Sequence, residues 1–143
     1  MPIRNASARW EGGGLKAGKG TFKGETGLGG NYSFASRFEN GPGSNPEELL
    51  AAAESACFAM ALSSGLEKNA TPPKWVDVKA ACTIEMVGGA PTITTMALTV
   101  RASVPGIDNA NYQKIAAATK EGCPVSKALK GNVNITLSAA LEG

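Results

Sequence analysis

Three cysteines, Cys57, Cys82 and Cys123, are the residues of this chain whose type is best suited to chemistry, and they lie far apart. A cysteine thiolate is a nucleophile, and it can be oxidised to a sulfenic acid or a disulfide. The chain has no histidine, which excludes Ser-His-Asp and Cys-His catalysis and removes the commonest ligand of a catalytic zinc. An arginine, a lysine, a helix terminus or burial must therefore set the reactivity of any functional cysteine.

Cys57 and Cys82 both lie in apolar patterns. Cys82 falls on the apolar side of an alternating strand, between Ala80 and Ile84, where a thiol behaves as a small hydrophobic side chain. Cys57 lies in the middle of an apolar helical stretch, where burial raises a thiol pKa and favours an inert, packing role. A reactive Cys57 would need a cation from elsewhere, and Arg37 is the candidate. From the residues alone, both interpretations of Cys57 stay open.

Cys123 has the better local case for reactivity. In the segment Gly122-Cys123-Pro124 its sulfur occupies an N-cap position, near unpaired backbone N–H groups and the positive end of a helix. These groups would favour a thiolate. The alternative is a cysteine that only caps a helix.

The elements that must position these residues follow from hydrophobic periodicity and turn signals. Short alternations in the first forty residues predict three strands, near 6–10, 18–25 and 32–38. Asn45 is a good N-cap, Pro46 suits the first helical position, and Glu47 and Glu48 place negative charge in the first turn. A long helix should run from there to about 65–69. From Leu49 to Leu62 it is apolar around most of its circumference, interrupted only by Glu54 and Ser55, and it must be buried on more than one side.

The second half of the chain predicts a sheet with two further helices. Strands are expected at 76–86 and 96–104, a helix from Asp108 to about 121, a short helix at 124–130, and a last strand at 133–141. The fold class is α+β, with an antiparallel sheet wrapped on a long buried central helix. Residues 1–143 have the size of a single domain.

Composition narrows the function classes. The 14 basic and 12 acidic residues are scattered, without a basic stripe that would track nucleic acid. The N-terminal segment lacks the pattern of a signal peptide, and no apolar run is expected to span a bilayer, so a cytoplasmic protein is predicted. No flavin, nicotinamide or metal signature is present, so no bound cofactor is expected.

Several motifs together resemble those of the osmotically inducible protein C (OsmC) peroxidases, within the OsmC/Ohr family. They are Trp10-Glu11-Gly12, Ser36-Arg37-Phe38-Glu39, Asn45-Pro46-Glu47-Glu48, Ala56-Cys57-Phe58, Val104-Pro105-Gly106-Ile107-Asp108 and Gly122-Cys123-Pro124-Val125-Ser126. Both cysteine motifs occur in the family order and spacing, and the resemblance covers essentially the whole chain. The segments around Arg37 and Cys123 look more like OsmC than like its sister branch, the organic hydroperoxide resistance (Ohr) proteins.

The resemblance implies an intertwined homodimer with two active sites at the subunit interface, acting on organic hydroperoxides and less efficiently on hydrogen peroxide. By motif, Cys57 is the peroxidatic cysteine, Cys123 the resolving one, Arg37 the activating cation and Glu47 its carboxylate partner. First attack then belongs to Cys57, although local physics alone ranks Cys123 higher. Cys82 has no counterpart in the family motifs.

The implied reaction is a two-step oxidation of thiols. Cys57 attacks the peroxide and becomes a sulfenic acid, and Cys123 condenses with it to form a disulfide. An external dithiol, such as a lipoyl-bearing or other small thiol, must then reduce that bond. The alternatives are a redox sensor or binding module that uses the same disulfide without turnover, and a non-catalytic α+β dimer with incidental cysteines.

Overall fold

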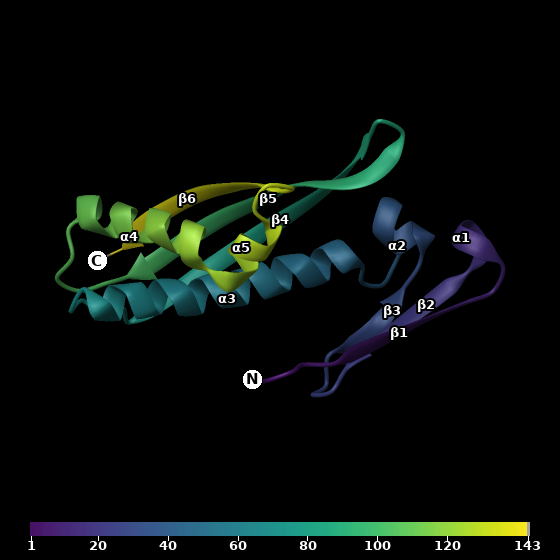
Figure 1. The fold of residues 1–143 in the computed structure, drawn as a ribbon, viewed down its shortest axis with the longest axis horizontal. Coiled ribbons are helices and arrows are strands. Elements are labelled where there is room, and N and C mark those ends of the chain that lie inside the picture. Colours follow the sequence, from purple (N-terminus) through teal and green to yellow (C-terminus); the bar gives the residue numbers. More distant parts are fainter. Residues whose placement is uncertain (143) are drawn as a thin grey trace. The chain divides into compact units, whose positions relative to one another are not determined.

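A computed structural model describes residues 1–142 of the chain. The described residues form two compact units, Met1–Leu49 and a second that begins at Leu50, and Figure 1 labels their elements. In chain order these are β1 (Ala6–Glu11), α1 (Gly14–Ala17), β2 (Lys19–Gly24), β3 (Gly29–Tyr32), α2 (Phe34–Phe38), α3 (Pro46–Lys68), β4 (Trp75–Val87), β5 (Ala90–Ser103), α4 (Asn109–Gly122), α5 (Pro124–Leu129) and β6 (Asn134–Glu142).

The first unit is a three-stranded antiparallel sheet in the order β1-β2-β3. Aromatic side chains hold it together, because the Tyr32 ring lies 5.4 Å from that of Trp10 and 6.1 Å from that of Phe22, centroid to centroid. Such tilted and edge-to-face pairs are favourable beyond their area burial. The chain then continues from β3 into α2.

The predicted strand at 32–38 is wrong beyond Tyr32, since Phe34–Phe38 is a helix that carries Arg37. Ser33 and Ser36 form a reciprocal capping box, each side-chain oxygen accepting from the backbone N–H of the other at 3.1 and 2.8 Å. Phe34 and Phe38 are four residues apart, and their rings lie 5.1 Å apart on one helix face. In so short a segment, this spacing also fits the alternation of a strand.

The long helix α3 begins and ends as predicted. Asn45 caps it, accepting a hydrogen bond from the Glu48 N–H at 2.8 Å, and Pro46 is its first residue. The helix ends at Lys68.

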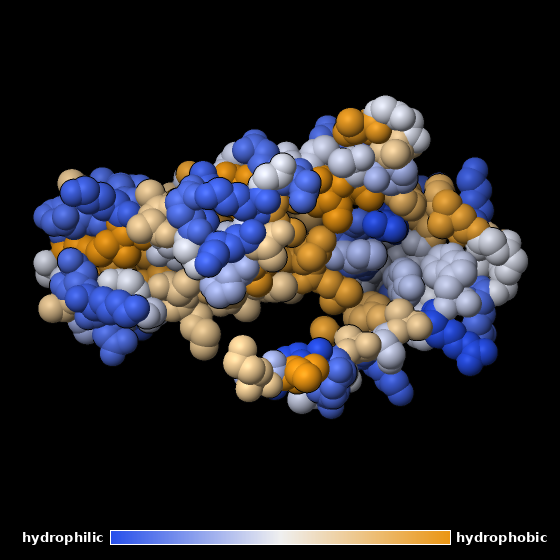
Figure 2. Space-filling view, viewed as in Figure 1, coloured by the Kyte–Doolittle hydropathy of each residue, from blue (hydrophilic) through white to orange (hydrophobic). Residues whose placement is uncertain are grey.

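Burial divides α3 into two faces. Phe58, Leu62 and Leu66 are fully buried in the core of the second unit. Ala52, Ala53, Ala56 and Met60 are exposed, Met60 with 78% of its surface. Figure 2 shows apolar surface along the middle of α3, next to the hydrophilic side chains of α4 and α5. The expected burial on more than one side is therefore not reached within the described chain.

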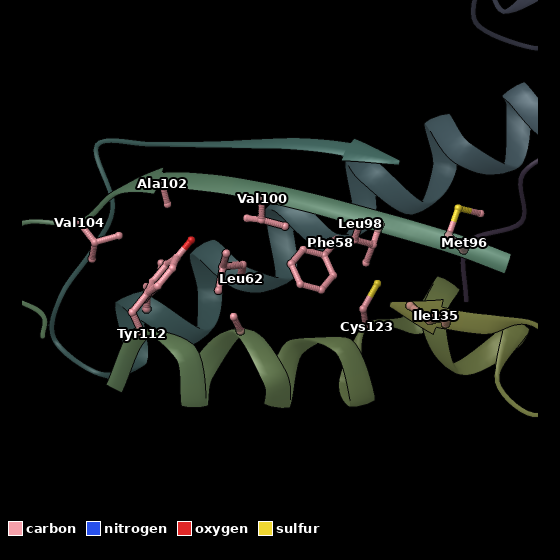
Figure 3. Close-up of a cluster of buried hydrophobic side chains, with 12 residues drawn as sticks. Phe58, Leu62, Met96, Leu98, Val100, Ala102, Val104, Tyr112, Cys123 and Ile135 are labelled. Atoms are coloured by element: carbon pink, nitrogen blue, oxygen red, sulfur yellow. The ribbon is translucent and has the colours of Figure 1, made fainter. Parts of the chain in front are cut away.

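One expectation about membranes is corrected. The prediction that no segment is apolar enough to cross a bilayer is wrong, because α3 is long and apolar enough to do so. Only 22% of the most apolar window of α3 is buried in the chain. The core helix of a soluble protein passes the same test. The face with Phe58 and Leu62 belongs to a protein core, as Figure 3 shows.

The sheet of the second unit has the order β4-β5-β6. Gly88 and Gly89 join β4 to β5 with φ angles of 58° and 81°, the positive values that a two-residue hairpin turn requires. The prediction that the sheet is antiparallel throughout is wrong for this unit, because β6 pairs in parallel with β5. Parallel neighbours need a long crossover connection, and α4 and α5 provide it.

The core of the second unit lies between β5, α3 and α4. Alternate residues of β5, Met96, Leu98, Val100 and Ala102, are buried there, and Figure 3 shows them facing Phe58, Leu62, Tyr112 and Cys123. Gly65 lets α3 approach α4 closely, since a Cβ there would lie 3.0 Å from the Ile115 side chain. Cys82 packs on the same side of the sheet, as its alternation predicts.

Candidate active site

Two cysteines that are 66 residues apart in sequence meet in the second unit. The Sγ atom of Cys57, on α3, lies 3.0 Å from the Sγ atom of Cys123, between α4 and α5. Both are free thiols. A disulfide has its sulfurs about 2.05 Å apart, so an approach of about 1 Å would join them.

Helical hydrogen bonds hold Cys123 in place. Its backbone N–H donates to the Thr119 carbonyl at 2.8 Å, and its own carbonyl accepts from the Lys127 N–H at 2.9 Å. It therefore ends α4 and begins α5. The side chain makes no capping hydrogen bond to α5. Figure 3 shows the sulfur pointing into the core, toward Phe58.

The two sulfurs differ in exposure and environment. Cys57 is partly exposed, whereas Cys123 is fully buried. Burial raises the pKa of Cys57, and the hydrogen bond with Cys123 and the charge of Glu54 raise it further, against a backbone hydrogen bond from Val125 that lowers it. The expectation that burial disfavours the Cys57 thiolate is confirmed. Within the second unit, Cys57 is accessible but not activated.

A buried carboxylate, Glu54, stands beside the sulfur pair, and the sequence analysis did not single it out. It has no exposed surface and precedes Cys57 by three residues on α3, so both lie on the same helix face. Its Oε1 atom accepts hydrogen bonds from the Ser126 hydroxyl and from Cys123 Sγ, the latter at 3.8 Å. The sequence does contain a signal for Glu54, because it is the single carboxylate in an otherwise apolar stretch of the helix.

The other two predicted site residues form an ion pair in the first unit. Arg37 Nη2 and Nε donate to Glu47 Oε1 at 2.8 and 3.1 Å, and Nε also approaches Oε2 at 3.3 Å. The Glu47 side chain is 7% exposed and that of Arg37 34% exposed. The Nη1 group of Arg37 takes no part in this ion pair. The four predicted residues thus occur as two pairs, one in each unit.

A pocket of about 410 Å³ opens beside Arg37 in the first unit. Its walls are mainly aromatic and aliphatic; the lining residues are Trp10, Gly14, Leu15, Tyr32, Ser33, Phe34, Arg37 and Phe38. Sequence reasoning named no pocket residues, because the pocket is formed by β1, α1, β3 and α2, which are brought together only by folding. An apolar cavity with a single cation is suited to a small organic molecule that has one polar end.

Sequence comparison defines the class of protein. Residues 39–138 match the family model described as OsmC-like protein, and the chain belongs to that family. It is 40% identical over 134 residues to Peroxiredoxin OsmC of Escherichia coli (strain K12), covering 92% of this chain and 93% of the relative. It is also 33% identical over 101 residues to the Organic hydroperoxide resistance protein of Xanthomonas axonopodis pv. citri (strain 306), covering 70% and 69%.

Solved structures show the same fold. The organic hydroperoxide resistance protein OhrB of Bacillus subtilis superposes with a TM-score of 0.74 at 24% identity, over 96% of this chain and 98% of that one. The predicted OsmC/Ohr family and the predicted α+β class are therefore confirmed.

Proposed function

We propose that this protein is a cysteine-based thiol peroxidase that reduces organic hydroperoxides, and hydrogen peroxide less efficiently, in defence against oxidative stress. The observation that carries the proposal is the pair of free thiols 3.0 Å apart, one accessible and one buried. Relatives named as a peroxiredoxin and as an organic hydroperoxide resistance protein support it.

The different exposures of the two sulfurs support the following order of events. Cys57, the accessible thiol, attacks the distal peroxide oxygen as a thiolate; the O–O bond breaks, the alkoxide leaves and takes a proton to become the alcohol. Cys57 is then a sulfenic acid. Cys123 forms the S–S bond as the S–O bond breaks and water leaves. An external dithiol, such as a lipoyl group or another small thiol, reduces the disulfide and completes the cycle.

Arg37 is proposed to supply the positive charge that Cys57 lacks. The pKa of Cys57 is raised, so a cation beside its sulfur would favour the thiolate during turnover. Arg37 is partly exposed and is oriented by Glu47 through Nε and Nη2, an ion pair in which Nη1 takes no part. Because a guanidinium is a planar fork, it can bind a carboxylate and a thiolate together. The pocket beside it would hold the organic group of the hydroperoxide.

We further propose that the active form is a homodimer in which two α3 helices cross. Glu47 and Cys57 are ten residues apart on α3, roughly 15 Å along its axis, so they cannot share a site on one straight helix. If two copies cross antiparallel near Ala52, Glu47 of one subunit comes level with Cys57 of the other. The exposed face of Ala52, Ala53 and Met60 supports such an approach.

The dimer is expected to be stable in sedimentation at micromolar concentration. Ala52→Glu, which would place two like charges at the crossing, should give a monomer with little peroxidase activity. Lys68→Glu changes charge at an exposed residue at the end of the same helix and should leave the dimer intact. A fully active monomer would contradict the shared site.

The function is tested by steady consumption of an organic hydroperoxide in the presence of a dithiol. Many turnovers per protein are expected, with alcohol as the product, and they should depend on the dithiol. A single oxidation without turnover would instead favour a redox sensor. A cytoplasmic location belongs to the same proposal, and in that reducing compartment the cysteines would be thiols at the start of each cycle.

A further inference from the structure

Glu54 is a fully buried carboxylate to which the mechanism above gives no task. A carboxylate inside a protein is costly unless hydrogen bonds compensate it, yet only its Oε1 atom is bonded, to Ser126 and Cys123. Its buried Oε2 atom has no hydrogen-bond partner among residues 1–142. Buried polar atoms without a hydrogen-bond partner are rare in proteins, and Glu54 lies beside two reactive sulfurs, so its burial calls for a chemical explanation.

The second step of the cycle, disulfide formation, requires a proton transfer from a thiol that solvent does not reach. Cys123 must attack as a thiolate, but its sulfur is fully buried and cannot release its proton to water directly. While Cys57 is reduced, its sulfur is one acceptor for the Cys123 proton, at 3.0 Å. Once Cys57 is a sulfenic acid, its sulfur is no longer a thiolate base. The Glu54 carboxylate, at 3.8 Å, is the other acceptor in contact with Cys123.

We propose that Glu54 is the general base and acid of the resolving step, an inference that rests on the proposed peroxidase cycle. Its carboxylate takes the proton of the Cys123 thiol. The sulfur lone pair thus released forms the S–S bond with Cys57, and the electron pair of the S–O bond leaves with the hydroxyl group. Glu54 then returns its proton to that hydroxide, giving water. Atoms and charges balance without any further reactant.

Ser126 is the positioning residue for this carboxylate. Ser126 is 1% exposed, and its hydroxyl donates to Glu54 Oε1, which fixes the carboxylate beside the first turn of α5. Cys123 and Ser126 belong to the same turn, since Cys123 is the N-cap of α5 and Ser126 its third residue. The motif Gly122-Cys123-Pro124-Val125-Ser126 therefore supplies both the resolving thiol, Cys123, and the hydroxyl that positions Glu54, Ser126.

Glu54→Gln tests the proposal, because an amide oxygen can still accept from Ser126 but cannot take a proton at neutral pH. One equivalent of cumene hydroperoxide is added, and samples are quenched in time with dimedone and with an alkylating agent. Peptide mapping then follows the Cys57 sulfenic acid and the Cys57–Cys123 disulfide separately. Sulfenic acid should form at the wild-type rate, while disulfide formation slows about 100-fold, the usual share of a general base.

Glu67→Gln is the matched control, since Glu67 is an exposed glutamate on the same helix, and both steps should keep their wild-type rates. Disulfide formation at the wild-type rate in Glu54→Gln would overturn the role of Glu54. Failure to form any sulfenic acid in the wild-type protein would instead overturn the peroxidase function itself. The two failures are thus distinguishable.

A pH profile of the resolving step gives a readout that a purely structural role would not move. Among the described residues, the titratable groups beside Glu54 are Cys57 on its own helix and Cys123 between α4 and α5, and Ser126 adds a hydroxyl. With Glu54 as base, the resolving step does not need hydroxide from solvent, so the wild-type rate should depend much less on pH than the rate of Glu54→Gln. In Glu54→Gln it should rise about tenfold per pH unit as solvent hydroxide takes over. A tenfold rise per unit in the wild-type protein would refute the proposal even if the variant does not fold.

Discussion

The two units of the molecule each bury a glutamate of α3, and they treat it differently. Glu47, in the first unit, is paired with a cation through two nitrogen atoms of Arg37. Among the described residues, Glu54, in the second unit, forms hydrogen bonds only with a hydroxyl and a thiol. A paired carboxylate has its charge compensated and serves as an anchor, whereas a buried carboxylate with uncharged partners has no opposite charge to compensate it. The comparison teaches that the position on one helix does not decide the role of a carboxylate; its partners do.

The same contrast holds for the reactive groups. The first unit has a cation and an apolar pocket but no cysteine, and the second has all three cysteines but leaves the pKa of Cys57 raised. Neither unit by itself contains both a nucleophile and the charge that would activate it. The proposed homodimer joins the two halves of this chemistry, and three sets of variants test the division from its largest effect to its smallest.

Replacing Cys57 removes the nucleophile of the second unit, so Cys57→Ser should abolish hydroperoxide turnover. No cysteine should be oxidised rapidly in that variant, because Cys123 is buried and depends on Cys57 for its partner. Quenched mass spectrometry after one equivalent of hydroperoxide measures this directly. Cys82→Ala should keep full activity. Rapid sulfenylation of Cys123 in Cys57→Ser would reverse the assigned roles.

Removing the cation of the first unit is expected to cost less than removing the nucleophile. Arg37→Ala should lower the peroxidase rate about 100-fold or more at neutral pH, with little loss of stability. The pKa of Cys57 would then stay raised by burial and by its neighbours Cys123 and Glu54, so the activity should recover toward alkaline pH as hydroxide forms the thiolate.

Arg37→Lys is the matched variant, and it should recover only part of the rate, because one ammonium cannot bind Glu47 and a thiolate as a fork does. Rates measured from about pH 6 to 10 would show the shift. Wild-type activity at neutral pH in Arg37→Ala would remove the arginine from the mechanism.

Two helix caps provide the smallest and most selective comparison. Ser33 caps α2, which carries Arg37, and Asp108 caps α4, accepting from the Asn111 N–H at 2.8 Å. Ser33→Ala and Asp108→Ala should each lower the free energy of unfolding by about 1 kcal/mol. Only Ser33→Ala should also lower peroxidase activity, because it loosens the helix that orients the guanidinium. Denaturant unfolding and steady-state rates, measured together, check both; an equal loss of activity in the two variants would argue against this division.

Family, fold class and most element boundaries could be predicted from sequence, because they depend on local signals. The cap at Asn45 and the alternation of β4 and β6 each specify an element within a few residues. Local signals failed at Phe34–Phe38, where a spacing of four residues between aromatic side chains fits both a strand and a helix, and the cap at Ser33 decided for the helix.

The sequence by itself determined which residues have reactive side chains, and in which order they occur. Only the tertiary structure decided which of them meet: Cys57 with Cys123 across 66 residues, and Glu54 with Ser126 across 72. It also decided that β6 runs parallel to β5. The physical reason is that contacts between distant segments depend on how whole elements pack against a shared core, which periodicity within one segment does not encode. Glu54 looked like a mere interruption of an apolar helix until its neighbours were known.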